Sequence, residues 1–273
     1  LVHDRHDAPE LVDVHRFVNE WEKTASLDLR HGRTGAIDAY TDHDRITGGN
    51  TEAMIDAAYT GWRTDTLAGI ATVLIADSNE SVHALNQRAR ADLILDGTVN
   101  ALREVELHDT SRASIGDTVI TRRNDRRLHA GRGWVRNGDR WTVADVRDDG
   151  SLTVRRAGTR PGGAVVLPAG YVAEHVDLGY AVTAHRAQGI TTDTARVLAD
   201  ASTTRENLYV AMTRGRQANL VYVATDLPDG SHDGPHPADN PDATARSVLY
   251  GVLQHVGAEL SAHETITAEQ EAW

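Results

Sequence analysis

Apolar residues near position 70 follow first the spacing of a strand and then that of a helix. Residues 71–76, ATVLIA, form a continuous apolar run, which is typical of a strand buried on both faces of a parallel sheet. Residues 77–79 can cap a following helix, which Gly97 would end. One face of that helix is apolar and consists of Val82, Leu85, Ala89 and Leu93. The pattern predicts an α/β fold.

Helical spacing also predicts helices upstream of this unit. One is expected around residues 12–22, and another over residues 51–62 with Thr51 as its N-cap. Between them, the Gly-Gly-Asn sequence at residues 48–50 is expected to interrupt regular structure.

After residue 110 the apolar period changes to two, which indicates strands with one buried face. A hairpin turn is predicted at Asp148-Asp149-Gly150. Short strands are predicted at residues 118–120, 141–146, 152–155 and 165–167. We expect them to form a small SH3-like β-barrel.

The α/β pattern returns past residue 179. A strand at 196–199, a helix opened by a Thr203-x-x-Glu206 capping box and running to about Arg214, and a strand at 219–225 predict a βαβ unit. The barrel would thus be inserted in one α/β domain. A polar linker over 226–242 then leads to a helix. Its predicted apolar face consists of Val248, Leu249, Val252, Leu253 and Val256, and a second capping box is predicted at Ser261 and Glu264.

Charge is distributed unevenly along the 273 residues. The formal net charge of −12 argues against a nucleic-acid partner, but residues 112–160 hold twelve arginines and six carboxylates. Residues 226–273 hold nine carboxylates and one arginine. A basic module, able to follow a phosphate backbone, and an acidic tail therefore share one chain.

Composition excludes several classes of site. No cysteine is present, so disulfides and thiolate zinc sites are excluded, and the fourteen histidines lack a metal-ligand spacing. No apolar run approaches the roughly 20 residues of a membrane span, and we expect a cytoplasmic protein. The one lysine, Lys23, follows Glu22 and cannot belong to a phosphate-binding Gly-Lys-Ser/Thr loop. The first residue is Leu1 rather than Met, and we therefore expect the sequence to be a piece of a longer protein.

Two segments carry the candidate chemistry: residues 179–193, GYAVTAHRAQGITTD, and residues 204–216, TRENLYVAMTRGR. In the second, Arg214 would end a helix, from which a guanidinium could project onto a phosphate. A plainer interpretation is an arginine that complements the dipole at a helix C-terminus.

The first segment resembles motif V of RecD-like superfamily 1B DNA helicases, and the second resembles motif VI. Arg16, followed by Phe17, resembles the motif IV arginine. A wider resemblance, over roughly residues 10–225, is to the helicase domain of TraA/TrwC-type conjugative relaxases. It is carried by Trp62 and by the sequences LNQRAR, GDTVITRRND, WVRNGDRW and LPAGYV. It implies a second RecA-like lobe. That lobe would comprise residues 1–110 and 173–226, an inserted SH3-like barrel at 111–172, and an acidic linker with a C-terminal helical tail at 227–273.

The resemblance also implies roles. Arg214 and Arg16 would contact the γ-phosphate of ATP, with Arg214 as the arginine finger. Gln188 and Gly189 would join the nucleotide cleft to the DNA track, and Gln188 would count among the catalytic residues. Thr183 and His185 would lie near single-stranded DNA. The P-loop and the Mg²⁺ ligands would belong to a first lobe that these residues lack, so the chain alone is not expected to hydrolyse ATP.

The basic module supplies further DNA-binding candidates, since arginines pair with phosphates and aromatic rings stack on bases. They are Arg122, Arg123, Arg126, Arg127 and Trp134, the arginines being expected in a loop near Asn124. For Trp134 and Trp141, a place in the barrel core is the favoured interpretation.

The expected partners are single-stranded DNA, the first RecA-like lobe and a relaxase domain of the same protein, and we expect a monomer. Two other interpretations stay open. The chain could be a non-catalytic nucleic-acid-binding or docking module with a degenerate helicase fold, or part of a repair helicase that resembles the exonuclease V α-subunit.

Overall fold

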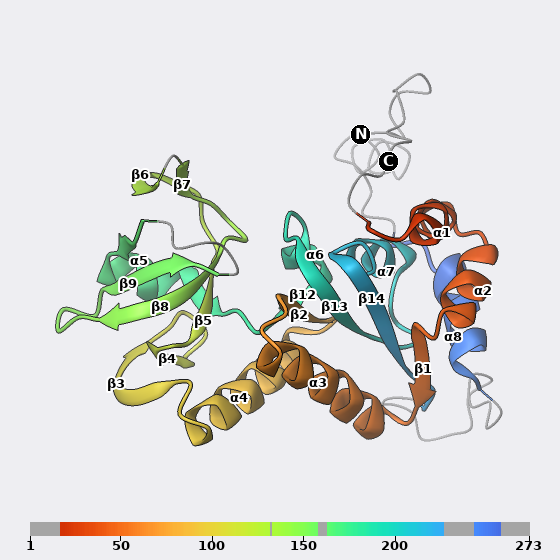
Figure 1. The fold of residues 1–273 in the computed structure, drawn as a ribbon, viewed down its shortest axis with the longest axis horizontal. Helices are drawn as coiled ribbons and strands as arrows, with labels where there is room; N and C mark the ends of the chain where they lie inside the picture. Colours follow the sequence, from red (N-terminus) through yellow and green to blue (C-terminus); the bar gives the residue numbers. More distant parts are fainter. Residues whose placement is uncertain (1–16, 132, 158–162, 227–242, 258–273) are drawn as a thin grey trace, which may run out of the picture.

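The computed structural model describes residues 17–131, 133–157, 163–226 and 243–257. In this part of the chain a parallel sheet enclosed by helices lies beside an antiparallel sheet with two short hairpins (Figure 1). We call the first the α/β module and the second the β module.

The α/β module is built on a five-stranded sheet in which every neighbouring pair is parallel, in the order β1-β14-β13-β2-β12. The strands are β1 (Ile46–Gly49), β2 (Thr72–Ala76), β12 (Ala181–Thr183), β13 (Thr192–Ala199) and β14 (Gly215–Ala224). Strand β2 is buried along its whole length, which confirms the strand predicted at 71–76. Strands β13 and β14 are joined through a helix and run parallel, which confirms the predicted βαβ unit.

Helices cover both faces of this sheet. The residues of β2 alternate between two hydrophobic clusters, with Leu74 and Ala76 in one and Val73 and Ile75 in the other. The first cluster includes residues of α3 (Thr51–Leu67) and α4 (Asn79–Leu95). The second includes residues of α1 (Glu20–Arg30), α2 (Gly35–Asp42), α6 (Ala184–Ala187), α7 (Arg205–Ala211) and α8 (Ala245–Gln254). The sheet is therefore the middle of three layers.

The β module contains an antiparallel sheet in the order β10-β9-β8-β5-β11. Its strands are β5 (Thr118–Thr121), β8 (Arg140–Val146), β9 (Leu152–Arg156), β10 (Val165–Leu167) and β11 (Val176–Leu178), with α5 (Ala169–His175) before the last. The hairpins are β3 (Asn100–Glu106) with β4 (Arg112–Ile115), and β6 (Asp125–Ala130) with β7 (Gly133–Val135). The four strands predicted from the period of two are confirmed. Closure into an SH3-like barrel and the domain boundaries at residues 110, 172 and 226 stay predictions.

Four local predictions were wrong, three near the N-terminus and one in the βαβ unit. Residues 48 and 49 continue β1, where the α8 residue Ala245 packs so closely on Gly48 that no side chain would fit. Helix α3 is capped by the Asn50 side chain, which accepts from the Ala53 amide at 2.8 Å, rather than by Thr51. The first described helix begins at Glu20, after non-helical residues 17–19. Helix α7 is capped by Thr204, not by Thr203, and it ends at Ala211.

The predicted C-terminal helix is present as α8, where a Thr244 capping box precedes it and Leu249, Val252 and Leu253 are buried. Val256 follows the helix and is half exposed rather than part of its apolar face. The second predicted capping box, at residues 261–264, lies outside the described residues.

Candidate functional site

The segment that resembles motif V leaves the edge of the parallel sheet at β12. Thr183 ends this strand, and its hydroxyl caps α6 by accepting from the Arg186 amide at 3.3 Å. His185 and Gln188 are exposed. Gly189 follows with a φ of +92°, a conformation that favours glycine. The strand end therefore leads into α6 and the following turn, where His185, Gln188 and Gly189 are exposed.

Arg214 lies between α7 and β14 and is 7% exposed. Its Nε donates to the Val210 carbonyl, in the last turn of α7, at 2.7 Å. Its Nη2 donates to the Thr213 hydroxyl at 2.6 Å, and its Nη1 to the Ala187 carbonyl at 3.4 Å. The expectation that Arg214 projects from a helix end was wrong, because α7 stops three residues earlier and the guanidinium is held on protein oxygens.

These contacts bring the two motif-like segments together, since Ala187 ends α6 in the first segment and Arg214 belongs to the second. Arg16 lies outside the described residues. The described chain begins close by: the Val18 amide donates to the Arg216 carbonyl at 2.8 Å, and Asn19 Nδ2 to the Gln217 carbonyl at 2.9 Å. Phe17 is buried. Residues 17–19 are thus anchored to the start of the strand that Arg214 precedes.

Two of the four predicted arginines of the β module lie on the β6–β7 hairpin. Arg126 and Arg127 belong to strand β6, not to a loop as expected, and Arg127 pairs with Asp125 at 2.9 Å. Trp134 in β7 is only partly buried. It lies beneath the guanidinium groups of Arg126 and Arg136, whose carbons are 5.6 and 5.1 Å from its ring centroid. A core position is thus correct for Trp141, which is fully buried, and wrong for Trp134.

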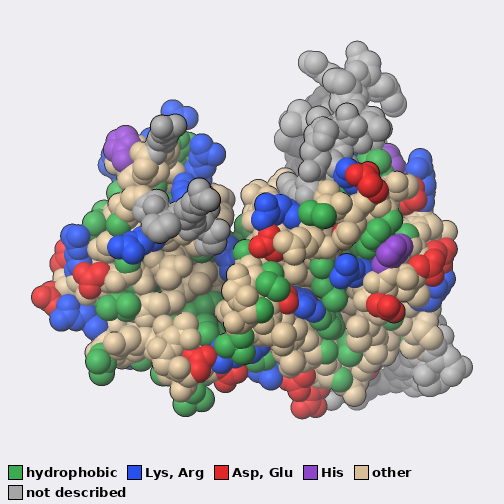
Figure 2. Space-filling model, viewed as in Figure 1, with side chains coloured by type: hydrophobic (Ala, Val, Ile, Leu, Met, Phe, Trp, Pro, Cys, Tyr) green, Lys and Arg blue, Asp and Glu red, His purple; other side chains and the backbone are tan. Residues whose placement is uncertain are grey.

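Arg122 and Arg123 follow β5 and both meet histidines. Arg122 contacts the His108 ring, and Arg123 Nη1 lies 3.0 Å from His175 Nε2. The space-filling view shows Arg and Lys side chains at several places on the β module, with carboxylates between them (Figure 2). Two of the predicted arginines, Arg122 and Arg127, are thus partly neutralised by carboxylates of the same module.

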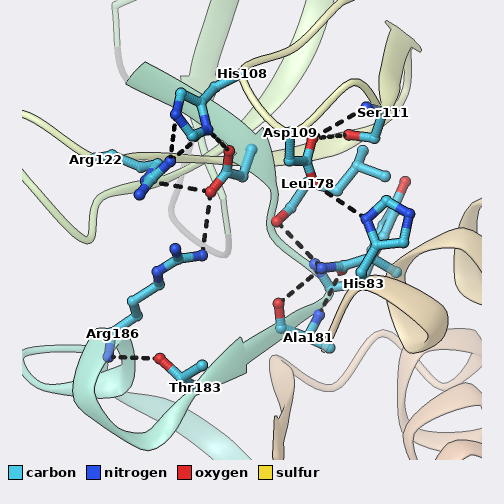
Figure 3. A network of polar contacts seen from close by, with 12 residues as sticks. His83, His108, Asp109, Ser111, Arg122, Leu178, Ala181, Thr183 and Arg186 are labelled. Atoms are coloured by element: carbon cyan, nitrogen blue, oxygen red, sulfur yellow. Dashed lines mark hydrogen bonds and ion pairs between the residues drawn. The ribbon is translucent and has the colours of Figure 1, made fainter. Parts of the chain in front are cut away.

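A buried carboxylate connects the two modules. Asp177 in β11, with a side chain 5% exposed, lies 3.1 Å from Arg186 Nη1 of α6, 3.3 Å from Arg122 Nε and 3.3 Å from His108 Nδ1 (Figure 3). Burial raises the pKa of Asp177, and Arg122 and Arg186 oppose that rise. Sequence reasoning missed this residue. Its only signal was a single acid between the apolar residues Val176 and Leu178.

The described residues offer little for a metal ion. Among them no group of three or more His, Asp or Glu side chains could hold one. Of the predicted nucleotide contacts, Arg214, Gln188 and Gly189 lie among these residues and Arg16 does not. Within the same ranges, no helix has the length and apolarity needed to cross a membrane.

Comparisons with known proteins agree with the resemblance found in the sequence. The AAA domain family model matches residues 1–51. A probable conjugal transfer protein TraA of Sinorhizobium fredii is 32% identical over 228 residues, which are 80% of this chain and 20% of that protein. The conjugal transfer protein TraA of Rhizobium radiobacter is 30% identical over 225 residues, 81% of this chain and 20% of that protein. This chain thus spans about a fifth of the length of these relatives.

Among solved structures, the Pif1 helicase from Candida albicans is similar with a TM-score of 0.49 and 15% identity. The similarity covers 77% of this chain and 55% of that one.

Proposed function

The chain is homologous to a segment of the TraA conjugal transfer proteins, and we propose that it forms the second RecA-like lobe of an ATP-dependent DNA helicase or translocase. Its α/β module would face a nucleotide held by a first lobe, and the two modules together would form part of a single-stranded DNA track. Because the 273 residues contain no Gly-Lys-Ser/Thr sequence, the P-loop would come from another lobe. A relaxase domain of the same protein would be the further partner.

The observation that carries this proposal is the hydrogen bond from Arg214 to the carbonyl of Ala187. It joins the segment proposed to sense the nucleotide to the segment proposed to touch DNA, and a motor needs such a connection. In the proposed mechanism, Arg214 would exchange its contacts with protein oxygens for the γ-phosphate when the lobes close. Arg16 would be a second phosphate ligand. Gln188 and Gly189 follow Ala187 directly, so a movement of Arg214 away from the Ala187 carbonyl would affect them.

The DNA side of the proposal rests on exposed side chains. His185 is exposed beside Thr183, and Trp134 with Arg126 and Arg136 offers a ring flanked by cations. Such a ring can stack on a base while the guanidinium groups pair with phosphates. Arg122 and Arg123 would extend this track towards α6.

The test measures DNA-stimulated ATP hydrolysis by the full-length protein or by this chain joined to a P-loop lobe. We expect Arg214→Ala to lower kcat by about 10³ to 10⁵, as loss of an arginine finger does. The control is Arg246→Ala, because Arg246 is an exposed arginine of α8 that pairs with Asp38 and belongs to neither motif-like segment. Turnover in Arg214→Ala equal to that of the control would refute the assignment.

One observation favours a second candidate, a non-catalytic nucleic-acid-binding module. Arg214 is buried, and hydrogen bonds to Val210 and Thr213 suffice to give it a structural role. In that case Arg214→Ala would lower stability. Strand binding by the full-length protein would then show no response to ATP, whereas the motor proposal requires one.

A further inference from the structure

A groove of about 410 Å³ lies at the junction of the two modules. Its walls include the end of the motif V-like segment, residues 189–193, and residues 138–140 of the β module. Ile70, Leu93 and Ile190 supply apolar surface. A volume of this size falls within the range of about 300 to 1,000 Å³ that is typical of small-molecule sites.

Three arginines and two aspartates line this groove, and two of the arginines are paired there. Arg156 meets both oxygens of Asp139, at 2.9 and 3.1 Å. Arg216 pairs with Asp193. The remaining arginine is Arg140. Among the described residues, no carboxylate oxygen lies within 4.0 Å of its guanidinium nitrogens, the limit for an ion pair. The lining side chains thus carry one uncompensated positive charge.

Arg140 is fixed in place by main-chain oxygens of β2 and of the connection between β11 and β12. Its Nε donates to the Gly179 carbonyl and its Nη1 to the Thr72 carbonyl, both at 3.0 Å. Its Nη2 has no acceptor among the described residues. Burial lowers the pKa of Arg140 to about 10, so the guanidinium stays charged at neutral pH. A half-buried cation without a counter-ion is costly, and an anionic ligand would offset that cost.

From this charge and this position, we propose that the groove binds one nucleotide unit, with Arg140 contacting its phosphate and the apolar wall contacting its base. The inference deepens the proposed function, on which it rests, because the groove adjoins the proposed DNA track. Gly138, with a φ of +83°, faces the Arg186 and Gln188 carbonyls at this point. The nucleotide could belong to a DNA strand or be free, and the experiment separates these two sources.

The first measurement is the affinity of the whole chain for fluorescent oligo(dT) over a series of salt concentrations. If the nucleotide belongs to a strand, Arg140→Gln should raise Kd at low salt about tenfold, as loss of a charge-assisted hydrogen bond does. It should also reduce the slope of log K against log salt by about 0.7, the value of one single-strand phosphate contact. A purely structural arginine would leave the slope unchanged. The control is Arg103→Gln, which removes an exposed charge of the β module outside the groove.

The second measurement is calorimetric titration with ADP and with inorganic phosphate. If ADP binding weakens in Arg140→Gln and oligo(dT) binding does not, the ligand is a free nucleotide. If Arg140→Gln folds and binds oligo(dT), ADP and inorganic phosphate as tightly as the wild type does, the inference is refuted.

A second variant keeps the test valid if Arg140→Gln fails to fold. Thr98 is exposed at the groove, so Thr98→Trp should fill it with Arg140 intact and weaken the same ligand. Unchanged binding by Thr98→Trp would also refute the inference. A failure of the proposed function alone would give another result. The wild type would then not bind oligo(dT), while ADP binding would still depend on Arg140. A wild type that binds neither ligand would refute both.

Discussion

Replacing Asp177 by asparagine should separate the contributions of charge and shape at the connection between the modules. The carboxylate faces two guanidinium groups and a histidine ring, all within 3.3 Å. Both guanidinium groups contact Oδ2, whereas Oδ1 makes no hydrogen bond, so asparagine can keep an oxygen at the first position and place its amide nitrogen at the second. The substitution therefore removes the ionic component and leaves the packing of β11 unchanged.

The magnitude follows from how well the pairs are shielded from water. A hydrogen bond between charged groups contributes about 1.5–3 kcal/mol when buried, and an exposed ion pair about 0.2–1 kcal/mol. Asp177 is 5% exposed, but Arg122 and Arg186 are 31% and 27% exposed, so each pair should contribute about 1 kcal/mol. Asparagine is cheaper to bury than a carboxylate, which offsets part of the loss. We expect a net loss of about 1–2 kcal/mol of unfolding free energy.

Urea denaturation followed by circular dichroism measures this change. With an m-value of about 2 kcal/mol/M, the midpoint should fall by about 0.5–1 M. The matched control is Asp148→Asn in the same module, because Asp148 is 91% exposed and pairs only with an exposed arginine. Equal midpoints for wild type and Asp177→Asn would show that the network contributes nothing, and the reasoning from burial would fail.

Two further predictions concern the α/β module. Burial raises the pKa of Glu22, so the folded protein favours the protonated carboxyl. The stability that this contributes is present below the pKa of Glu22 in the unfolded chain and is lost as pH rises through its pKa in the folded protein. In thermal melts from pH 4 upwards, the stability of Glu22→Gln should therefore fall less than that of the wild type. Parallel pH profiles of the two proteins would contradict this. Leu253 in α8 is fully buried, so Leu253→Ala should cost about 2–5 kcal/mol in urea denaturation, whereas the exposed Gln254→Ala should cost little. Equal losses would mean that α8 is not part of the core.

Elements with a strong local period were predictable from the sequence. The apolar run in β2 and the spacing of α4 each encode a buried surface within one segment, so their neighbours need not be known. Strands of the β module were found for the same reason. Strand β1 was missed because two of its four residues are glycines. It is held by parallel pairing with β14 and by the close approach of α8, and neither contact is local in sequence.

The same distinction applies to the candidate site. The motif-like segments could be located from their residues, and their contact through Arg214 and Ala187 agrees with the adjacency that the resemblance implies. The packing of Arg214 could not be predicted, because it depends on where α7 ends, and helix ends are set by capping contacts. Asp177 and Arg140 were missed because their partners lie far away in the sequence, and each has one partner in the α/β module.

The contacts of residues 183–189 indicate where coupling between nucleotide and DNA would run. Arg186 reaches Asp177 of the β module, the Ala187 carbonyl receives Arg214, and the Gln188 carbonyl faces Gly138. This segment is thus held by the proposed nucleotide sensor on one side and by the β module on the other. If Arg214 moved to a phosphate, the segment would lose one of these contacts, and the surface proposed to lie against DNA would change with it. A helicase that depended on this segment would lose coupling between ATP hydrolysis and movement, rather than DNA binding, when Asp177 is neutralised.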